Sequence, residues 1–90
     1  MQRNFIGRLD YLGIDGNVGD SMEFDDILKF KEQLFSDCYY GIPVVVVLYK
    51  DSQNNHIPLD FINDLDPPPK GLKIIENPHT ELNPILEIKL

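Results

Sequence analysis

The run of four valines in PVVVVLY, residues 43–49, is the feature that most constrains how this chain can fold. Valine is branched at Cβ, which favours an extended backbone, and the run is apolar at odd and even positions alike. A strand with two apolar faces needs cover on both, at least in part, as a central strand of a sheet has. The run is too short to cross a bilayer, which takes about 20 helical residues. The sequence therefore predicts a central β-strand here.

A β-hairpin is predicted before this strand, with its two strands at about 4–14 and 17–24. Asp15-Gly16 separates them, and a glycine after an aspartate supplies the positive φ that a two-residue hairpin turn requires. The turn sets the pairing of the strands, because it decides which residues stand opposite each other. With this pairing Leu9 lies opposite Met22, and one face carries Leu9, Tyr11, Val18, Met22 and Phe24.

A helix is predicted between the hairpin and the valine strand. Asp25 or Asp26 can cap its start, because a carboxylate accepts hydrogen bonds from the free N–H groups of a first helical turn. Gly41 is expected to end it. Apolar residues at helical spacing predict one buried stripe, formed by Ile27, Phe30, Leu34 and Cys38 and widened by Leu28 and Phe35.

Residues 57–65, IPLDFINDL, allow two interpretations. Pro58 as a first helical residue, with Asp60 in the first turn, favours a short helix, which is the preferred prediction. The alternation of apolar residues in IPLDF favours an edge strand instead. Both interpretations stay open at this point.

The remaining segments complete a small α+β fold. DPPPKG can be neither helix nor central strand, because its prolines lack N–H donors, so it is expected to be a stiff connector. LKIIE and PILEIKL are expected to be two further strands. We therefore predict one domain over residues 1–90, ordered β-β-α-β-(short α)-β-β. Its sheet would be mostly antiparallel, with one main helix packed on it.

Charge and composition narrow the classes of function. The chain has 15 acidic and 8 basic residues, a net charge of −7, which disfavours nonspecific binding to nucleic acids or anionic membranes. Cys38 is the only cysteine, which suits a reducing compartment. The N-terminal MQRNFIGRLD has no apolar signal region. The expectation is a soluble cytoplasmic protein that binds neither membrane nor nucleic acid directly.

The acidic stretch 11–26, YLGIDGNVGDSMEFDD, invites a reading as a calcium loop. Counted from Asp15, position 5 is Gly19, position 6 is Asp20 and position 12 is Asp26, so the required glycine and final glutamate are missing. The glycines match no phosphate-binding pattern, and the histidines and cysteine match no common zinc spacing. No metal, cofactor or catalytic residues are therefore predicted.

The absence of a catalytic constellation favours a non-enzymatic protein-interaction or regulatory module. A first alternative is an acidic inhibitor that mimics nucleic acid and occupies a DNA- or RNA-binding protein. Its acids would be Asp20, Glu23, Asp25 and Asp26. A second alternative is a small enzyme with Cys38 as nucleophile and His56 or His79 as base.

The C-terminal segment ILEIKL suggests where a protein partner could bind. As the last predicted strand it is a candidate sheet edge, which offers unpaired N–H and C=O groups to a partner or to a second copy of the chain. Glu87, Ile88 and Lys89 would lie on that edge, and Tyr39 and Tyr40 could either add an aromatic anchor or equally belong to the core. These residues are the candidate partner-binding site, and a homodimer through the edge is one form it could take.

Two segments carry a resemblance to other proteins: YYGIPVVVVLYKD, and then IPLDFINDLDPPPKGLKI. Over roughly residues 11–76 the chain resembles short uncharacterised accessory proteins carried on conjugative mobile elements of gut bacteria. That group usually has a glycine-containing turn where this chain has Asn54-Asn55. The resemblance implies an accessory gene product in the bacterial cytoplasm, and it implies no particular activity.

Overall fold

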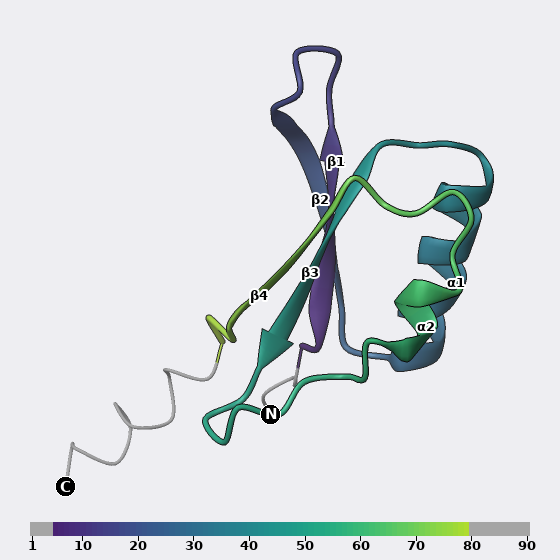
Figure 1. The fold of residues 1–90 in the computed structure, drawn as a ribbon. Coiled ribbons are helices and arrows are strands. Elements are labelled where there is room, and N and C mark those ends of the chain that lie inside the picture. Colours follow the sequence, from purple (N-terminus) through teal and green to yellow (C-terminus); the bar gives the residue numbers. More distant parts are fainter. Residues whose placement is uncertain (1–4, 80–90) are drawn as a thin grey trace, which may run out of the picture.

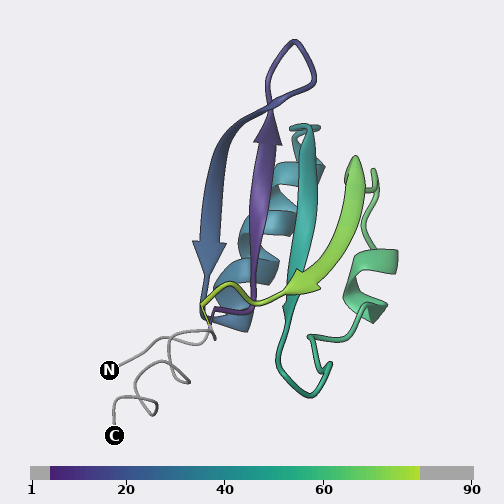
Figure 2. The same cartoon turned by 90° about the vertical axis from the view of Figure 1, so that its left-hand side faces the viewer.

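The computed structural model describes residues 5–79. Its elements are β1 (Gly7–Leu12), β2 (Val18–Phe24), α1 (Ile27–Tyr39), β3 (Val44–Lys50), α2 (Asp60–Asn63) and β4 (Gly71–Glu76). The strands form one sheet in the order β2-β1-β3-β4, in which only β3 and β4 run parallel. Figure 1 shows the sheet nearly edge-on with both helices on one side of it, and Figure 2 shows the opposite, open face.

This architecture confirms a small α+β domain with a mostly antiparallel sheet and one main helix. The first six predicted elements occur in the predicted order. The seventh, the strand PILEIKL, lies outside the described residues.

Strand β3 is central, as its valines predict. It pairs with β1 on one side and β4 on the other, and Val44, Val46 and Val47 are fully buried. Val44 and Val46 face α1 and belong to the core cluster. Val47 is on the other face, between Arg8 and Lys73 on the neighbouring strands, whose aliphatic stems can cover it.

Most of β1 and β2 pair as predicted, but the loop between the two strands differs from the predicted turn. The Gly13 N–H donates to the Asn17 carbonyl over 2.8 Å, so the loop has three residues, Ile14 to Gly16, and not two. Gly16 has φ of 83°, the left-handed conformation that such a loop requires. The longer loop shifts the pairing of β1 with β2 by one residue. A β-bulge at Gly19, which has no partner in β1, restores the predicted pairing from Tyr11 and Asp20 onward.

The bulge has a consequence for the predicted apolar face. On the side of the bulge away from the loop, Leu9 pairs with Met22 as predicted. On the loop side, Val18 pairs with Leu12 and so lies on the opposite face of the sheet from Leu9. The placement of Val18 with Leu9 was therefore wrong, and Val18 is 55% exposed. Because side chains alternate along a strand, one extra residue moves those beyond it to the other face.

Gly16 offers a direct test of the hairpin. We expect Gly16→Val to lower the free energy of unfolding by about 1 kcal/mol or more, because a β-branched residue resists positive φ. Chemical denaturation followed by circular dichroism measures it. Gly19→Ala is the control, since an added Cβ would come no closer than 4.0 Å to the Tyr11 carbonyl oxygen. Equal losses in both variants would contradict the assignment.

Helix α1 begins and ends at the predicted residues. Asp26 is its N-cap, and its Oδ1 accepts hydrogen bonds from the N–H groups of Leu28 and Lys29. At the other end Gly41 has φ of 71°, and the Ile42 N–H donates to the Asp37 carbonyl over 2.8 Å, the pattern of a Schellman cap.

The buried stripe of α1 is narrower than predicted. Phe30, Leu34 and Cys38 are buried and Ile27 packs against them, as expected. Leu28 and Phe35 are exposed, which corrects the prediction that they widen the stripe. They lie about 100° around the helix from the buried side chains, where the sheet does not reach.

Residues 57–65 contain the preferred short helix, not an edge strand. It is a single turn, Asp60–Asn63, with Leu59 as N-cap, so Pro58 precedes the helix and is not its first residue. Before it, Asn54 has φ of 66°, a left-handed conformation that glycine adopts most readily. The Asp51 carboxylate also stabilises this turn, because it accepts a hydrogen bond from the Asn55 N–H.

Two buried carboxylates were not predicted. Asp37 on α1 accepts hydrogen bonds from the Tyr11 hydroxyl over 2.5 Å and from the Gln33 amide over 2.9 Å, which joins the helix to β1. Burial, and then the bond to Asp37, raises the pKa of Tyr11. On the open face, Asp10 accepts from Arg8 and Ser21, each over 2.8 Å.

Asp10 makes stability sensitive to acid. Burial alone would raise the pKa of its carboxyl, but the bonds from Arg8 and Ser21 together outweigh burial and lower it. A folded pKa below the unfolded value of about 3.9 stabilises the fold above that pH, and the contribution is lost as the pH falls through the folded value. We expect urea denaturation to show a loss of stability below about pH 4 that is shallower in Asp10→Asn. Equal slopes would exclude this role.

Candidate interaction surface

Large apolar side chains are exposed along one side of α1. Leu28, Phe35 and Tyr39 are 69%, 42% and 77% exposed. Their spacing of seven and then four residues places them in one row along the helix. The next residue, Tyr40, is the C-cap of α1 and is 72% exposed. Helix α1 thus has a second apolar stripe, which lies to the side of the buried stripe and ends in two tyrosines.

The tyrosine end of this stripe borders a groove of about 510 Å³, called the aromatic groove below. One wall comes from the last turns of α1, and the other comes from the chain that follows α2. Leu65 and Cys38 are buried and form the base. The residues that line it are Phe35, Ser36, Cys38, Tyr39, Tyr40, Asp64, Leu65 and Asp66.

The two tyrosine rings contact each other edge-to-face. Their centroids are 5.0 Å apart at an interplanar angle of 86°, a favourable arrangement for an aromatic pair. The contact helps to hold both rings at the groove although neither is buried in the core. Tyr39 and Tyr40 therefore have the exposure that the predicted aromatic anchor requires. Glu87, Ile88 and Lys89 lie outside the described residues.

The opposite wall is acidic. Asp64 and Asp66 are exposed, and neither carboxylate forms an ion pair or a side-chain hydrogen bond with any other residue between 5 and 79. No lysine or arginine of the described part of the chain lines this groove. The groove thus combines aromatic rings on one side with unneutralised negative charge on the other.

Cys38 lacks the surroundings of an activated nucleophile. Its side chain is buried, and burial, followed by the charge of Asp37, raises the pKa of the thiol. The structure does not bring either histidine to it. The Nδ1 of His56 is 2.8 Å from the Ile57 carbonyl oxygen, and the Nε2 of His79 is 2.6 Å from a carboxylate oxygen of Glu23.

The acids of the predicted mimic serve partly in the fold itself. Asp26 caps α1, and Glu23 accepts a hydrogen bond from the Tyr49 hydroxyl and contacts His79. Asp20 Oδ1 accepts from the Ser21 N–H. These acids lie on β2 and at the start of α1, so the structure does not gather them at the aromatic groove.

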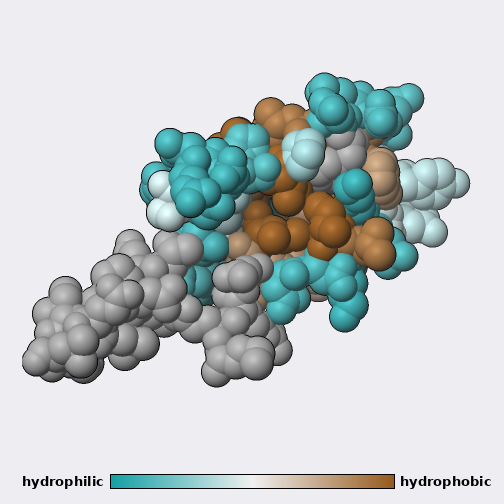
Figure 3. All heavy atoms as spheres, turned by 90° about the horizontal axis from the view of Figure 1, so that it is seen from below, coloured by the Kyte–Doolittle hydropathy of each residue, from teal (hydrophilic) through white to brown (hydrophobic). Residues whose placement is uncertain are grey.

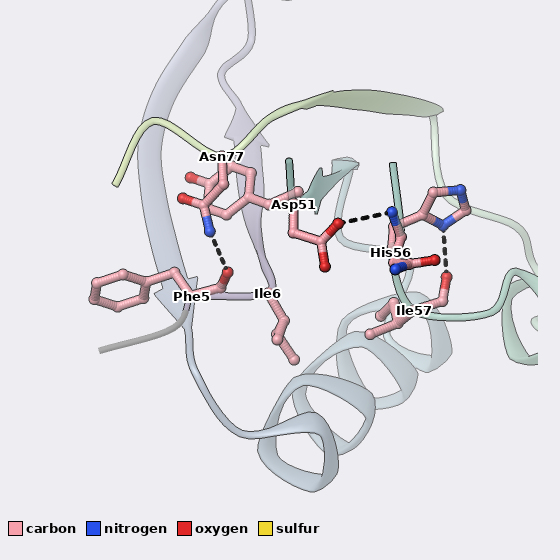
Figure 4. Close-up of a pocket in the computed structure, with 8 residues that line it drawn as sticks. Phe5, Ile6, Asp51, His56, Ile57 and Asn77 are labelled. Atoms are coloured by element: carbon pink, nitrogen blue, oxygen red, sulfur yellow. Dashed lines mark hydrogen bonds between the residues drawn. The ribbon is translucent and has the colours of Figure 1, made fainter. Parts of the chain in front are cut away.

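A second hollow, of about 390 Å³, lies at the end of the sheet where β3 ends. Figure 3 views this end and shows apolar side chains in the middle of a polar rim. Figure 4 shows its polar groups bonded within the fold: Asn77 donates to the Phe5 carbonyl, and Asp51 accepts from a backbone N–H. His56 likewise contacts the Ile57 carbonyl. The polar groups of this hollow serve the turn and the strand ends.

Sequence reasoning found the tyrosines but missed Phe35, Asp64 and Asp66. Phe35 fits either apolar stripe by spacing, and only the position of the sheet separates the two. The acids sit in a loop far from α1 in sequence, so no local pattern joins them to Tyr39 and Tyr40. The repeat of Leu28, Phe35 and Tyr39 was the one available signal for an outer stripe.

Comparison with known proteins leaves this surface to be interpreted from its own chemistry. Within residues 5–79 no three histidine, cysteine or acidic side chains are grouped as metal ligands. No helix of that part is long and apolar enough to cross a membrane. No family model, curated protein or solved structure matches the chain.

Proposed function

We propose that this protein is a non-enzymatic interaction module, with the aromatic groove as the surface that binds a protein partner. The observation that carries the proposal is the pair of tyrosines, 77% and 72% exposed, at the edge of a groove. Tyrosine supplies a large, rigid contact area at low entropic cost and is enriched among the residues that dominate binding energy. We also propose, from the resemblance of residues 11–76, that it acts as an accessory protein of a bacterial mobile element.

The exposed stripe on α1 supports this proposal in a second way. An apolar row that ends at a groove gives a partner several contacts along one line, whereas scattered apolar residues are common on any surface. Leu28 and Phe35 extend the contact from the groove along the helix. A partner that covers this row would remove apolar area from water, which favours association.

The other hypotheses have less support. Burial and a raised thiol pKa disfavour Cys38 as a nucleophile. An acidic inhibitor would need its acids on one face, whereas Asp20 and Glu23 lie on opposite faces of β2. Self-association through a strand edge remains a proposal for the predicted strand PILEIKL, which lies outside the described residues. Among the described strands, β2 and β4 are the outer ones of the sheet.

Site-specific photo-crosslinking tests the proposed surface. A benzophenone amino acid is placed at Tyr39, at Tyr40 or, as control, at Val18, which is also exposed but lies on β2. In cells of the source organism we expect one discrete adduct of the same mass from both tyrosine positions and none from Val18. The adduct at Tyr40 should weaken when Phe35→Ser removes part of the groove wall.

Three outcomes would contradict the proposed surface. No adduct at either tyrosine would remove its basis. The same adduct from Val18 would show nonspecific capture. An adduct with the mass of two copies of this chain would show that the surface binds a second copy and not a different protein.

A further inference from the structure

We propose that the aromatic groove binds an arginine side chain, presented by an exposed segment of the partner protein. The guanidinium would lie between the rings of Tyr39 and Tyr40 on one wall and the carboxylates of Asp64 and Asp66 on the other. This inference rests on the proposed function and specifies the chemistry of the partner.

The charge of the groove selects a cation. Asp64 and Asp66 contribute two carboxylates to its lining, and the described residues contribute no basic side chain to it. In the free protein these exposed carboxylates are hydrated, so leaving them unpaired costs little. A partner cation would gain both interactions at once. The net charge of −7 also attracts a basic segment before contact.

The aromatic wall selects a cation that stacks. The face of a tyrosine ring attracts a cation through its quadrupole, by about 0.5–1 kcal/mol at exposed sites and more when water is excluded. Because the two rings meet edge-to-face at 86°, they present surfaces in two directions at the groove. Leu65 and Cys38, which are both buried, give the groove an apolar base.

Arginine fits this combination better than lysine. The guanidinium is planar, so it can stack on a ring while its N–H groups reach a carboxylate in a bidentate pair. The lysine ammonium is a compact, strongly hydrated charge that cannot do both as well. The groove volume of 510 Å³ is within the range of about 300–1,000 Å³ that ligand pockets span. It leaves room for the residue next to the arginine.

The test titrates short peptides into the ¹⁵N-labelled full chain and follows its amide shifts. The probe is acetyl-Leu-Arg-Leu-amide, and the comparison peptides carry lysine or the neutral isostere citrulline in place of arginine. We expect the arginine peptide to shift the amides of Tyr39, Tyr40 and Asp64 with a Kd near the millimolar range. Citrulline should bind about tenfold more weakly, a difference of about 1.4 kcal/mol, and lysine should bind measurably more weakly than arginine.

Matched variants separate the groove from net charge. Asp64→Asn with Asp66→Asn removes two charges at the groove, whereas Asp20→Asn with Glu76→Gln removes two on the sheet. We expect the first variant to weaken arginine-peptide binding about tenfold and the second to change it less than about twofold. Circular dichroism confirms that each variant is folded.

If both variants weakened peptide binding equally, the effect would come from the net charge of the protein and not from the groove, which would overturn the inference. Equal binding of the arginine and citrulline peptides would overturn it as well, and equal binding of lysine would overturn the assignment to arginine. If crosslinks at Tyr39 persist while the peptide result fails, only the arginine assignment falls. If crosslinks fail, the proposed function falls whatever the peptides do.

Discussion

Replacing Val46 by aspartate is expected to leave the chain unfolded. Val46 is fully buried in the central strand, opposite Leu9 on β1 and Leu72 on β4, and it faces the apolar core under α1. A carboxylate there would have no partner, and leaving a buried polar group unpaired costs several kcal/mol. A domain of this size is stable by only about 5–13 kcal/mol, at roughly 0.05–0.15 kcal/mol per residue. The core would also lose the apolar contacts of the Val46 side chain.

Far-UV circular dichroism and the dispersion of amide signals measure the outcome. Val18→Asp is the matched control, because it makes the same substitution on β2 at a position that is 55% exposed. We expect the control to stay folded. A cooperative thermal transition in Val46→Asp close to that of the parent would show that β3 does not form the centre of the core.

The second large effect is expected at Gly7, where the first strand passes close to its neighbour. A Cβ added there would lie 2.6 Å from the Val47 carbonyl oxygen and 3.2 Å from the ring of Phe30. Because the first of these atoms belongs to the backbone of a central strand, it cannot turn away as a flexible side chain could. We expect Gly7→Ala to lower the free energy of unfolding by about 1–3 kcal/mol, the usual cost of overpacking.

Gly71→Ala provides the control for Gly7. Gly71 begins β4, and a Cβ there would meet the Val45 methyl groups at 3.8 Å, an ordinary contact. Neither glycine has positive φ, so backbone strain does not distinguish them. We expect Gly71→Ala to be neutral or to stabilise by up to about 1 kcal/mol, since alanine restricts the unfolded chain. Similar losses from both substitutions in urea denaturation would show that the close approach at Gly7 carries no special cost.

Much of the fold follows from local signals in the sequence. The valines of β3 are apolar on both faces, so they predict a strand with neighbours on either side, and β3 has them. Asp26 and Gly41 bound α1 because each supplies what a helix end lacks, an acceptor for free N–H groups and a left-handed residue. The pairing of Leu9 with Met22 follows from side-chain alternation, although the loop that produces it differs from the predicted turn.

Only the tertiary structure decided which apolar residues are buried and which form a surface. Phe30 and Phe35 are both aromatic and both occur at helical spacing, but the sheet lies against only one of them. The spacing of apolar residues gives the angle between the two stripes on the helix, but it does not say which stripe the sheet covers. The bulge at Gly19 likewise moved Val18 away from the face of Leu9.

The candidate site depends on tertiary structure even more strongly. Tyr39 and Tyr40 lie at the end of α1, whereas Asp64 and Asp66 follow α2, with β3 between them in sequence. The parallel pairing of β3 with β4 requires the chain to cross back over the sheet, and this crossover carries residues 64–66 to the end of α1. The sequence by itself determined the helix ends and the central strand, and it indicated the tyrosine pair as a candidate anchor without deciding whether the pair is exposed. The groove that joins those tyrosines to two unneutralised carboxylates exists only because of the crossover, a long-range arrangement that no local spacing encodes.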